Sequence, residues 1–175
     1  LPLAIELCKK YEVIGFDINE NRINDLKSDL DRTGELQKQD LKFLKKINFT
    51  FDQDRLKGAV TYIITVPTPI DINNKPNLKP LISASKIVGA CITKGDIVIY
   101  ESTVYPGCTE ELCVPILEKV SNLKYNQDFF CGYSPERINP SDKKRKLTNI
   151  TKIVSGSNNE ALHFVNKLYS SVIAA

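Results

Sequence analysis

Residues 60–69 read VTYIITVPTP, and this stretch contains the strongest strand signal in the chain. The run from Val60 to Val66 is almost continuously apolar, which is typical of a strand covered on both faces. Pro67 and Pro69 then stiffen the backbone and leave the Thr68 hydroxyl as the hydrogen-bonding group of the turn. The stretch therefore predicts a buried strand whose carboxyl end presents a polar group.

Helical and strand patterns alternate on both sides of this stretch. Strands are predicted over residues 13–16, 48–51, 97–100, 129–133 and 153–154. Helical patterns cover residues 1–10, a segment capped by Asn19 with Ile23, Leu26 and Leu30 on one face, and residues 36–47, 78–92, 109–123 and 159–171. Such alternation predicts an α/β protein with a Rossmann-like, doubly wound, mostly parallel sheet and helices on both of its faces.

Composition limits the possible functions. The 175 residues are 42% apolar and 26% charged, as in one soluble globular domain, and the net charge of +3 is too small to indicate a nucleic acid partner. No segment reaches the roughly 18 uncharged apolar residues of a membrane helix, and no secretory leader is visible, so we expect a cytoplasmic protein. Five cysteines without a CxxC pair indicate neither a disulfide framework nor a metal site.

Asp17 follows the first predicted strand. Dinucleotide-binding units have an acidic residue at the carboxyl end of a corresponding strand. This acid accepts hydrogen bonds from the adenosine ribose and repels a 2′-phosphate, which favours NAD over NADP. Arg22, one helical turn later, either contacts the same ribose or is solvated. The alternative for Asp17 is a surface acid at the start of the helix capped by Asn19.

Polar groups also follow three later strands. Thr68 follows the first of them, Glu101, Ser102 and Thr103 follow the strand at 97–100, and Ser134-Pro135-Glu136-Arg137 follows the strand at 129–133. Each group alone is ordinary turn chemistry. Because ligands of open parallel sheets bind beyond the carboxyl ends of the strands, four such ends in a row predict a binding site.

Three motifs carry a family resemblance. The sequences VPTPID (66–71), ESTVYPGCTEE (101–111) and GYSPERINP (132–140), in this order and spacing, resemble the N-terminal domain of the nucleotide-sugar 6-dehydrogenases. These NAD-dependent enzymes oxidise UDP-glucose, UDP-N-acetylhexosamines or GDP-mannose to uronic acids. The third motif is similar to the branch that acts on UDP-N-acetylglucosamine or UDP-N-acetylgalactosamine, because Pro140 stands where the UDP-glucose branch has a second acid.

The resemblance implies a role for each motif residue. Asp17 and Arg22 would hold the adenosine ribose of NAD, and Pro67 and Thr68 would line the cofactor site. Thr103 would contact the cofactor and position a water or the reacting oxygen. Glu136 would activate water as an acid–base group, and the substrate would be bound by Glu136, Arg137, Ile138 and Asn139. The resemblance also implies a homo-oligomeric enzyme of polysaccharide precursor synthesis, with a UDP-N-acetylhexosamine as substrate.

The chain also departs from the family pattern. None of its cysteines stands at the position of the family's nucleophile, which lies in a later domain, and no glycine-rich phosphate loop with its preceding strand comes before Leu1. We therefore expect residues 1–175 to form a partial N-terminal NAD-binding domain, without the central helix and the UDP-sugar-binding domain. Such a chain would be inactive by itself and would bind NAD poorly.

Two other interpretations remain at this point. One is a non-catalytic Rossmann-like nucleotide-binding module whose N-terminus is complete. The other is a different two-domain NAD-dependent dehydrogenase that acts on a hydroxy acid.

Overall fold

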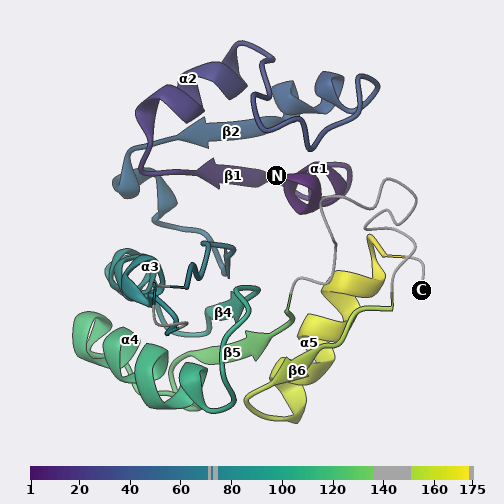
Figure 1. The fold of residues 1–175 in the computed structure, drawn as a ribbon. Helices are drawn as coiled ribbons and strands as arrows, with labels where there is room; N and C mark the ends of the chain where they lie inside the picture. The colour runs from purple at the N-terminus through teal and green to yellow at the C-terminus, as the bar shows by residue number, and fades with distance from the viewer. Residues whose placement is uncertain (71, 73–74, 136–150, 174–175) are drawn as a thin grey trace. The chain divides into compact units, whose positions relative to one another are not determined.

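A computed structural model describes residues 1–70, 72, 75–135 and 151–173, which fall into two compact units. Residues 1–56 belong to the first unit, and the described residues from 57 to 135 and from 151 to 173 belong to the second. Each unit has its own sheet (Figure 1).

The first unit is built on a two-stranded parallel sheet. Strand β1 (Val13–Phe16) pairs with β2 (Ile47–Thr50) over all four residues of each strand. The Asn19 side chain accepts a hydrogen bond from the backbone N–H of Arg22 at 3.2 Å, which confirms the predicted helix cap. The helical segments of this unit are α1 (Pro2–Leu7), α2 (Glu20–Lys27) and the 3₁₀ helices η1 (Leu41–Lys46) and η2 (Gln53–Leu56).

Apolar side chains from α1, α2, η1 and β2, together with Cys8 at the end of α1, form the core of the first unit. Gly15 of β1 has a packing role there, because a Cβ atom at this position would lie 2.6 Å from the Phe49 ring. Because Gly15 has no side chain, the Phe49 ring can pack directly against the Gly15 backbone. The buried members of this core are Ile5, Cys8, Ile23, Leu26, Leu44, Ile47 and Phe49.

The second unit has a four-stranded sheet in the order β3-β4-β5-β6. Strands β3 (Thr61–Ile64), β4 (Ile97–Tyr100) and β5 (Phe130–Tyr133) are parallel, whereas β6 (Ser155–Gly156) pairs with β5 in the antiparallel direction. The predicted α/β class with a mostly parallel sheet is confirmed.

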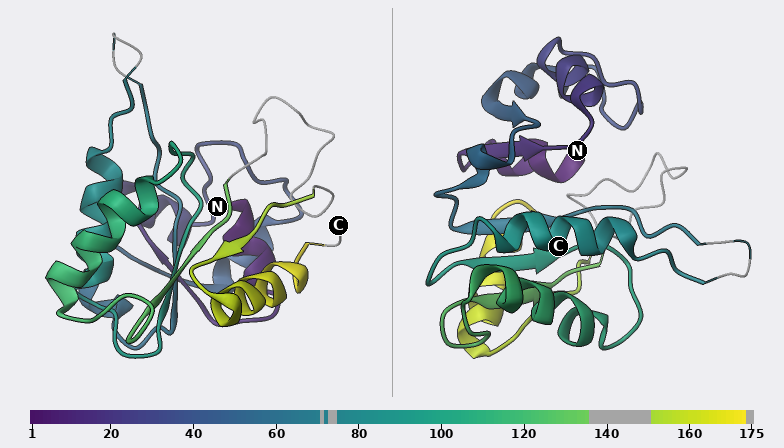
Figure 2. Two further views of the ribbon diagram at one scale, coloured as in Figure 1. Left: turned by 90° about the horizontal axis from the view of Figure 1, so that it is seen from below. Right: turned by 90° about the vertical axis from the view of Figure 1, so that its left-hand side faces the viewer.

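Helices cover both faces of this second sheet. Figure 2 shows α3 (Lys79–Gly89) and α4 (Val114–Ser121) on one face and α5 (Asn159–Ser170) on the other. A π-helical turn, η3 (Thr109–Cys113), leads directly into α4. All four residues of β4 are buried, as expected for a strand between two helical layers.

Three predicted segments differ from the structure. Between Val60 and Val66 the strand covers only Thr61–Ile64, and burial alternates along it, because successive side chains point to opposite faces and the face of Tyr62 and Ile64 is covered more fully than the other. The helix predicted for residues 36–47 is observed only as the 3₁₀ helix η1, Leu41–Lys46. The residues before it form a loop, in which the Leu36 N–H donates a hydrogen bond to Asp31 Oδ2 at 3.0 Å.

The last strand also begins later than predicted. The predicted strand at residues 153–154 is replaced by β6 at Ser155–Gly156. The Ile153 carbonyl accepts a hydrogen bond from the Ser134 side chain at 2.8 Å instead of joining the sheet. Leu30 lies beyond the end of α2 and is 46% exposed, so it does not extend the apolar face of that helix.

Across the described residues, every helix is too short or too polar to span a bilayer. In the same part of the chain, no group of three or more His, Cys, Asp or Glu side chains is arranged to hold a metal ion.

The contact between β6 and α5 gives a test of the fold. A Cβ atom at Gly156 would lie 2.1 Å from the Leu162 backbone nitrogen. We expect Gly156→Ala to lower the free energy of unfolding by about 1–3 kcal/mol or more, because the helix backbone must move away. Urea unfolding measures the effect, with Ser155→Ala on the same strand as the control. An unchanged midpoint in Gly156→Ala would contradict this packing.

Candidate functional site

Three strand ends meet at one edge of the second sheet. Because β3, β4 and β5 are parallel and paired in register, the residues after Ile64, Tyr100 and Tyr133 lie at the same edge. The ladder continues one residue further, since Glu101 donates its N–H to the Ile64 carbonyl and Ser134 donates to the Tyr100 carbonyl, each at 2.9 Å. This edge is where ligands of parallel sheets bind.

Two side chains join the turns after β3 and β4. The Ser102 hydroxyl donates to the Val66 carbonyl at 2.6 Å, and the Thr68 hydroxyl donates to the Thr103 carbonyl at 2.8 Å. The Thr103 side chain is exposed beside this double link, as is Pro67. The structure therefore brings Pro67, Thr68 and Thr103 together, as the sequence predicts.

A buried ion pair links the turns after β4 and β5. Lys152 Nζ lies 2.9 Å from Glu101 Oε2, and both side chains are only 2% exposed. The same ammonium group donates to the Ser134 carbonyl at 3.3 Å and to the Pro135 carbonyl at 3.5 Å. From α5, the Tyr169 hydroxyl donates a short hydrogen bond to Glu101 Oε1. Charged and polar groups thus meet in the interior of the second unit, and Glu101 among them is two residues before Thr103 in the sequence.

In the first unit, Asp17 stands at the carboxyl end of β1. Its side chain is exposed, and Oδ1 accepts a hydrogen bond from the Asn19 N–H at 2.8 Å. This bond turns the chain into α2. Asp17 is therefore where the sequence places it, while its contact with a ribose stays a prediction.

Arg22 is anchored to a loop of the first unit. Its Nη2 donates to Asp31 Oδ1 at 2.8 Å and to the Thr33 hydroxyl at 3.2 Å, and Nη1 is buried without a hydrogen-bond partner among the described residues. Burial would raise the pKa of Asp31, but hydrogen bonds from Thr33, Arg22 and the Leu36 backbone lower it to about 2. This ion pair organises the loop, and a ribose contact of Arg22 stays a prediction.

The remaining predicted site residues, Glu136, Arg137, Ile138 and Asn139, lie outside the described residues. Their expected contacts with the substrate stay predictions.

Comparison with known proteins identifies the family. Residues 1–173 match the model of the UDP-glucose/GDP-mannose dehydrogenase family, NAD binding domain. The chain belongs to this family. The family predicted from the three motifs is thereby confirmed, and so is NAD as the cofactor.

Relatives within the dehydrogenase family give a finer comparison. The chain is 52% identical to a UDP-N-acetyl-D-glucosamine 6-dehydrogenase of Pseudomonas aeruginosa, over 100% of this chain and 42% of that protein. It is 55% identical to Protein CapL of Staphylococcus aureus, over 100% of this chain and 41% of that protein. A solved structure of a UDP-D-ManNAc dehydrogenase from Pyrococcus horikoshii, at 30% identity, matches with a TM-score of 0.88 over 98% of this chain and 42% of that chain. The chain thus spans about two-fifths of the length of these relatives.

The cysteines of this dehydrogenase domain are structural. All five are buried, and burial is the main cause that raises the thiol pKa of Cys8, Cys108 and Cys113, in the last case to about 11. A raised pKa keeps a thiol protonated and poorly nucleophilic at neutral pH. The five cysteines are therefore small side chains of the protein interior, and Cys108, which follows the Pro106-Gly107 turn, is buried like the others.

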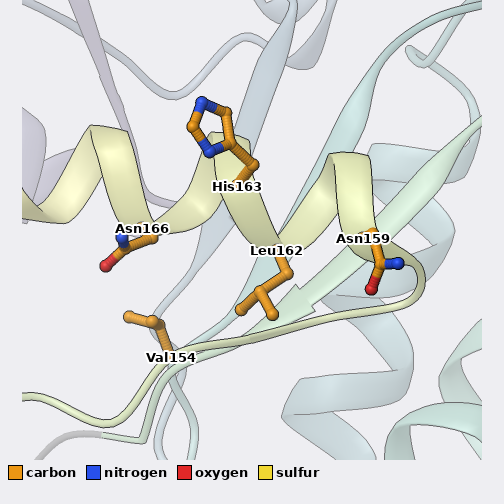
Figure 3. A pocket seen from close by; sticks show the side chains of 5 residues that line it. All are labelled: Val154, Asn159, Leu162, His163 and Asn166. Carbon is orange, nitrogen blue, oxygen red and sulfur yellow. The ribbon is translucent and has the colours of Figure 1, made fainter.

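A separate surface groove of about 440 Å³ lies along α5. Figure 3 shows Leu162 pointing toward Val154, with Asn159 and Asn166 along the same helix and the His163 ring on its other side. Among the described residues, its lining includes none of the predicted site residues, and His163 is the one titratable side chain there. A single titratable lining residue gives no catalytic pair within the described part of the groove.

Sequence reasoning missed Lys152 and Tyr169, and it treated Glu101 only as a polar strand end. One signal was present, because Glu101 follows four apolar strand residues directly, and an acid there is buried whenever its strand is covered on both faces. No local pattern marks a lysine 51 residues further along as its partner.

The Asp31 site predicts a pH dependence of stability. Because its pKa is about 2 in the folded chain and 3.8 for an unperturbed aspartate, Asp31 stabilises the fold above pH 3.8, and this contribution is lost as the pH falls toward 2. We expect Asp31→Asn to lower the free energy of unfolding by about 1–2 kcal/mol at pH 7, after allowance for solvent screening. Urea unfolding should show the difference shrinking below pH 4. A difference that stays constant down to pH 2.5 would contradict this assignment.

Proposed function

We propose that this chain is the NAD-binding part of an enzyme that oxidises C6 of a UDP-N-acetylhexosamine to a uronic acid. The observation that supports it most is the linked edge of the second sheet, where the VPTPID and ESTVYPGCTEE motifs are hydrogen-bonded to each other. Identity of 52% to a UDP-N-acetyl-D-glucosamine 6-dehydrogenase over the whole chain supports the choice of sugar.

The residues present fit NAD. Asp17 offers an exposed carboxylate at the carboxyl end of a parallel strand, which suits ribose hydroxyl donors and disfavours a 2′-phosphate. In the second unit, exposed Pro67 gives the cofactor an apolar contact. The Thr68 hydroxyl proton is already donated to Thr103, so Thr68 can only accept a hydrogen bond from the cofactor. Arg22 would support the ribose site through its anchored guanidinium.

The overall reaction needs two hydride transfers and one water. The primary alcohol, two NAD⁺ and one water give the carboxylate, two NADH and three protons, and bound NAD⁺ supplies the hydride acceptor. Thr103 would hold the reacting oxygen or the water with its exposed hydroxyl. Glu136 would take the proton from the water that hydrolyses an enzyme thioester, and Arg137, Ile138 and Asn139 would contact the sugar nucleotide.

The thioester requires a reactive cysteine, and the five buried cysteines do not offer one. We therefore propose that residues 1–175 alone are inactive, and that the nucleophile belongs to a further domain of the complete enzyme. As the resemblance implies, this enzyme would be a homo-oligomer of polysaccharide precursor synthesis, and we propose that it is cytoplasmic.

The stoichiometry of the complete enzyme tests the proposed function. We expect two NADH per UDP-N-acetylglucosamine or UDP-N-acetylgalactosamine consumed, measured by absorbance and by quantifying the uronic acid. One NADH per sugar would exclude the four-electron route. Activity on hydroxy acids without activity on UDP-sugars would favour a different NAD-dependent dehydrogenase.

Asp17 gives a test of the cofactor site. In the complete enzyme, we expect Asp17→Asn to raise KM for NAD about tenfold, since it weakens charge-assisted hydrogen bonds to the ribose, with a smaller effect on KM for the sugar. The variant should also use NADP better than the wild type does. Glu20→Gln, an exposed acid on the same segment, is the control and should leave both constants unchanged. Equal NAD constants in wild type and Asp17→Asn would remove Asp17 from the cofactor site.

A further inference from the structure

We propose that Lys152 and Glu101 are positioning residues that hold the turns after β4 and β5 in place for the proposed oxidation. This inference rests on the proposed function, because it concerns the same site. It goes beyond that function because it names a buried ion pair that holds the backbone of these two turns in position.

The ammonium group of Lys152 has all three of its N–H donors directed at these turns. One meets Glu101 Oε2 at 2.9 Å, and the others meet the carbonyls of Ser134 at 3.3 Å and Pro135 at 3.5 Å. Pro135 immediately precedes Glu136 in the sequence. A displacement of Lys152 therefore releases the Ser134 and Pro135 carbonyls, which belong to the two residues that precede Glu136 in the sequence.

The carboxylate of Glu101 is fixed from a second side. Tyr169 of α5 donates its hydroxyl proton to Oε1, and the Lys152 ammonium lies 5.2 Å from the centre of the Tyr169 ring. Glu101 therefore cannot rotate away from Lys152 without losing the hydrogen bond from α5. Two residues further on, the Thr103 carbonyl is held by Thr68, so the whole turn after β4 is anchored at both ends.

Energetics favour a positional role over a stabilising one. Burying two charges costs desolvation free energy, and the attraction between the charges does no more than offset this cost. An apolar pair of similar volume would therefore stabilise the fold equally well. Removal of one charge alone leaves the other unpaired in the interior and is strongly destabilising. Removal of both charges together should keep the fold and release the two turns.

The test compares variants of the complete enzyme. The double variant Glu101→Gln/Lys152→Met removes both charges and keeps an acceptor for Tyr169, and Lys152→Arg keeps the charge. Lys94→Met is the matched control, since Lys94 is 77% exposed and pairs with Asp128 at 3.0 Å. We expect the double variant to unfold at nearly the wild-type temperature and to lose about 10- to 100-fold in kcat, the scale of a misplacement near 1 Å. KM for NAD should change less than about threefold, and Lys152→Arg should keep more activity than the double variant.

Rapid mixing separates positioning from loss of folded enzyme. If the turn before Glu136 is displaced, thioester hydrolysis becomes the slow step, and about two NADH per active site appear in a burst before the slow steady state. If the pair were merely structural, burst and steady rate would fall together with the folded fraction. A folded double variant with wild-type kcat overturns this inference alone. A wild type that makes no NADH with any UDP-sugar overturns the proposed function and this inference with it.

Discussion

The carboxylate of Glu101 and the ammonium of Lys152 lie 2.9 Å apart where each side chain is only 2% exposed. Neither charge can be left alone in such an interior, so each determines the position of the other. Glu101 belongs to the turn after β4, and Lys152 also binds the carbonyls of the turn after β5. This buried ion pair therefore links two of the turns at the edge of the second sheet, where the family motifs lie.

Two further hydrogen bonds join the turns after β3 and β4 at this edge. The Ser102 and Thr68 hydroxyls each donate to a backbone carbonyl of the neighbouring turn, so their protons are committed to holding the backbone. Thr103 keeps an exposed side chain on a backbone that is held at both ends. An exposed hydroxyl on a backbone fixed by hydrogen bonds suits a site that must hold a reacting oxygen in one place.

The sequence predicts features that depend on neighbouring residues. The apolar run of β4, the Asn19 cap and the polar groups at the strand ends are local, and the structure contains them. Features set by distant partners were not predictable. Nothing near Lys152 indicates that it pairs with Glu101, 51 residues earlier in the chain. The hydrogen bond from the Leu36 N–H to Asp31 is short in sequence, but the apolar pattern of residues 36–47 does not reveal it. The alternating burial of β3 likewise depends on how fully each face of the sheet is covered by other elements, which its apolar sequence does not reveal.

A crystal structure of the complete enzyme with NAD and UDP-N-acetylglucosamine tests the central claim most directly. The account predicts that the Thr103 hydroxyl and the Glu136 carboxylate both lie within about 4 Å of the sugar C6 or of a water beside it, near the hydrogen-bond reach that acid–base catalysis requires. It also predicts that Lys152 still bonds Glu101 and the carbonyl of Pro135 in that complex. A sugar bound with its C6 remote from Thr103, or a Lys152 ammonium turned away from both turns, would contradict it.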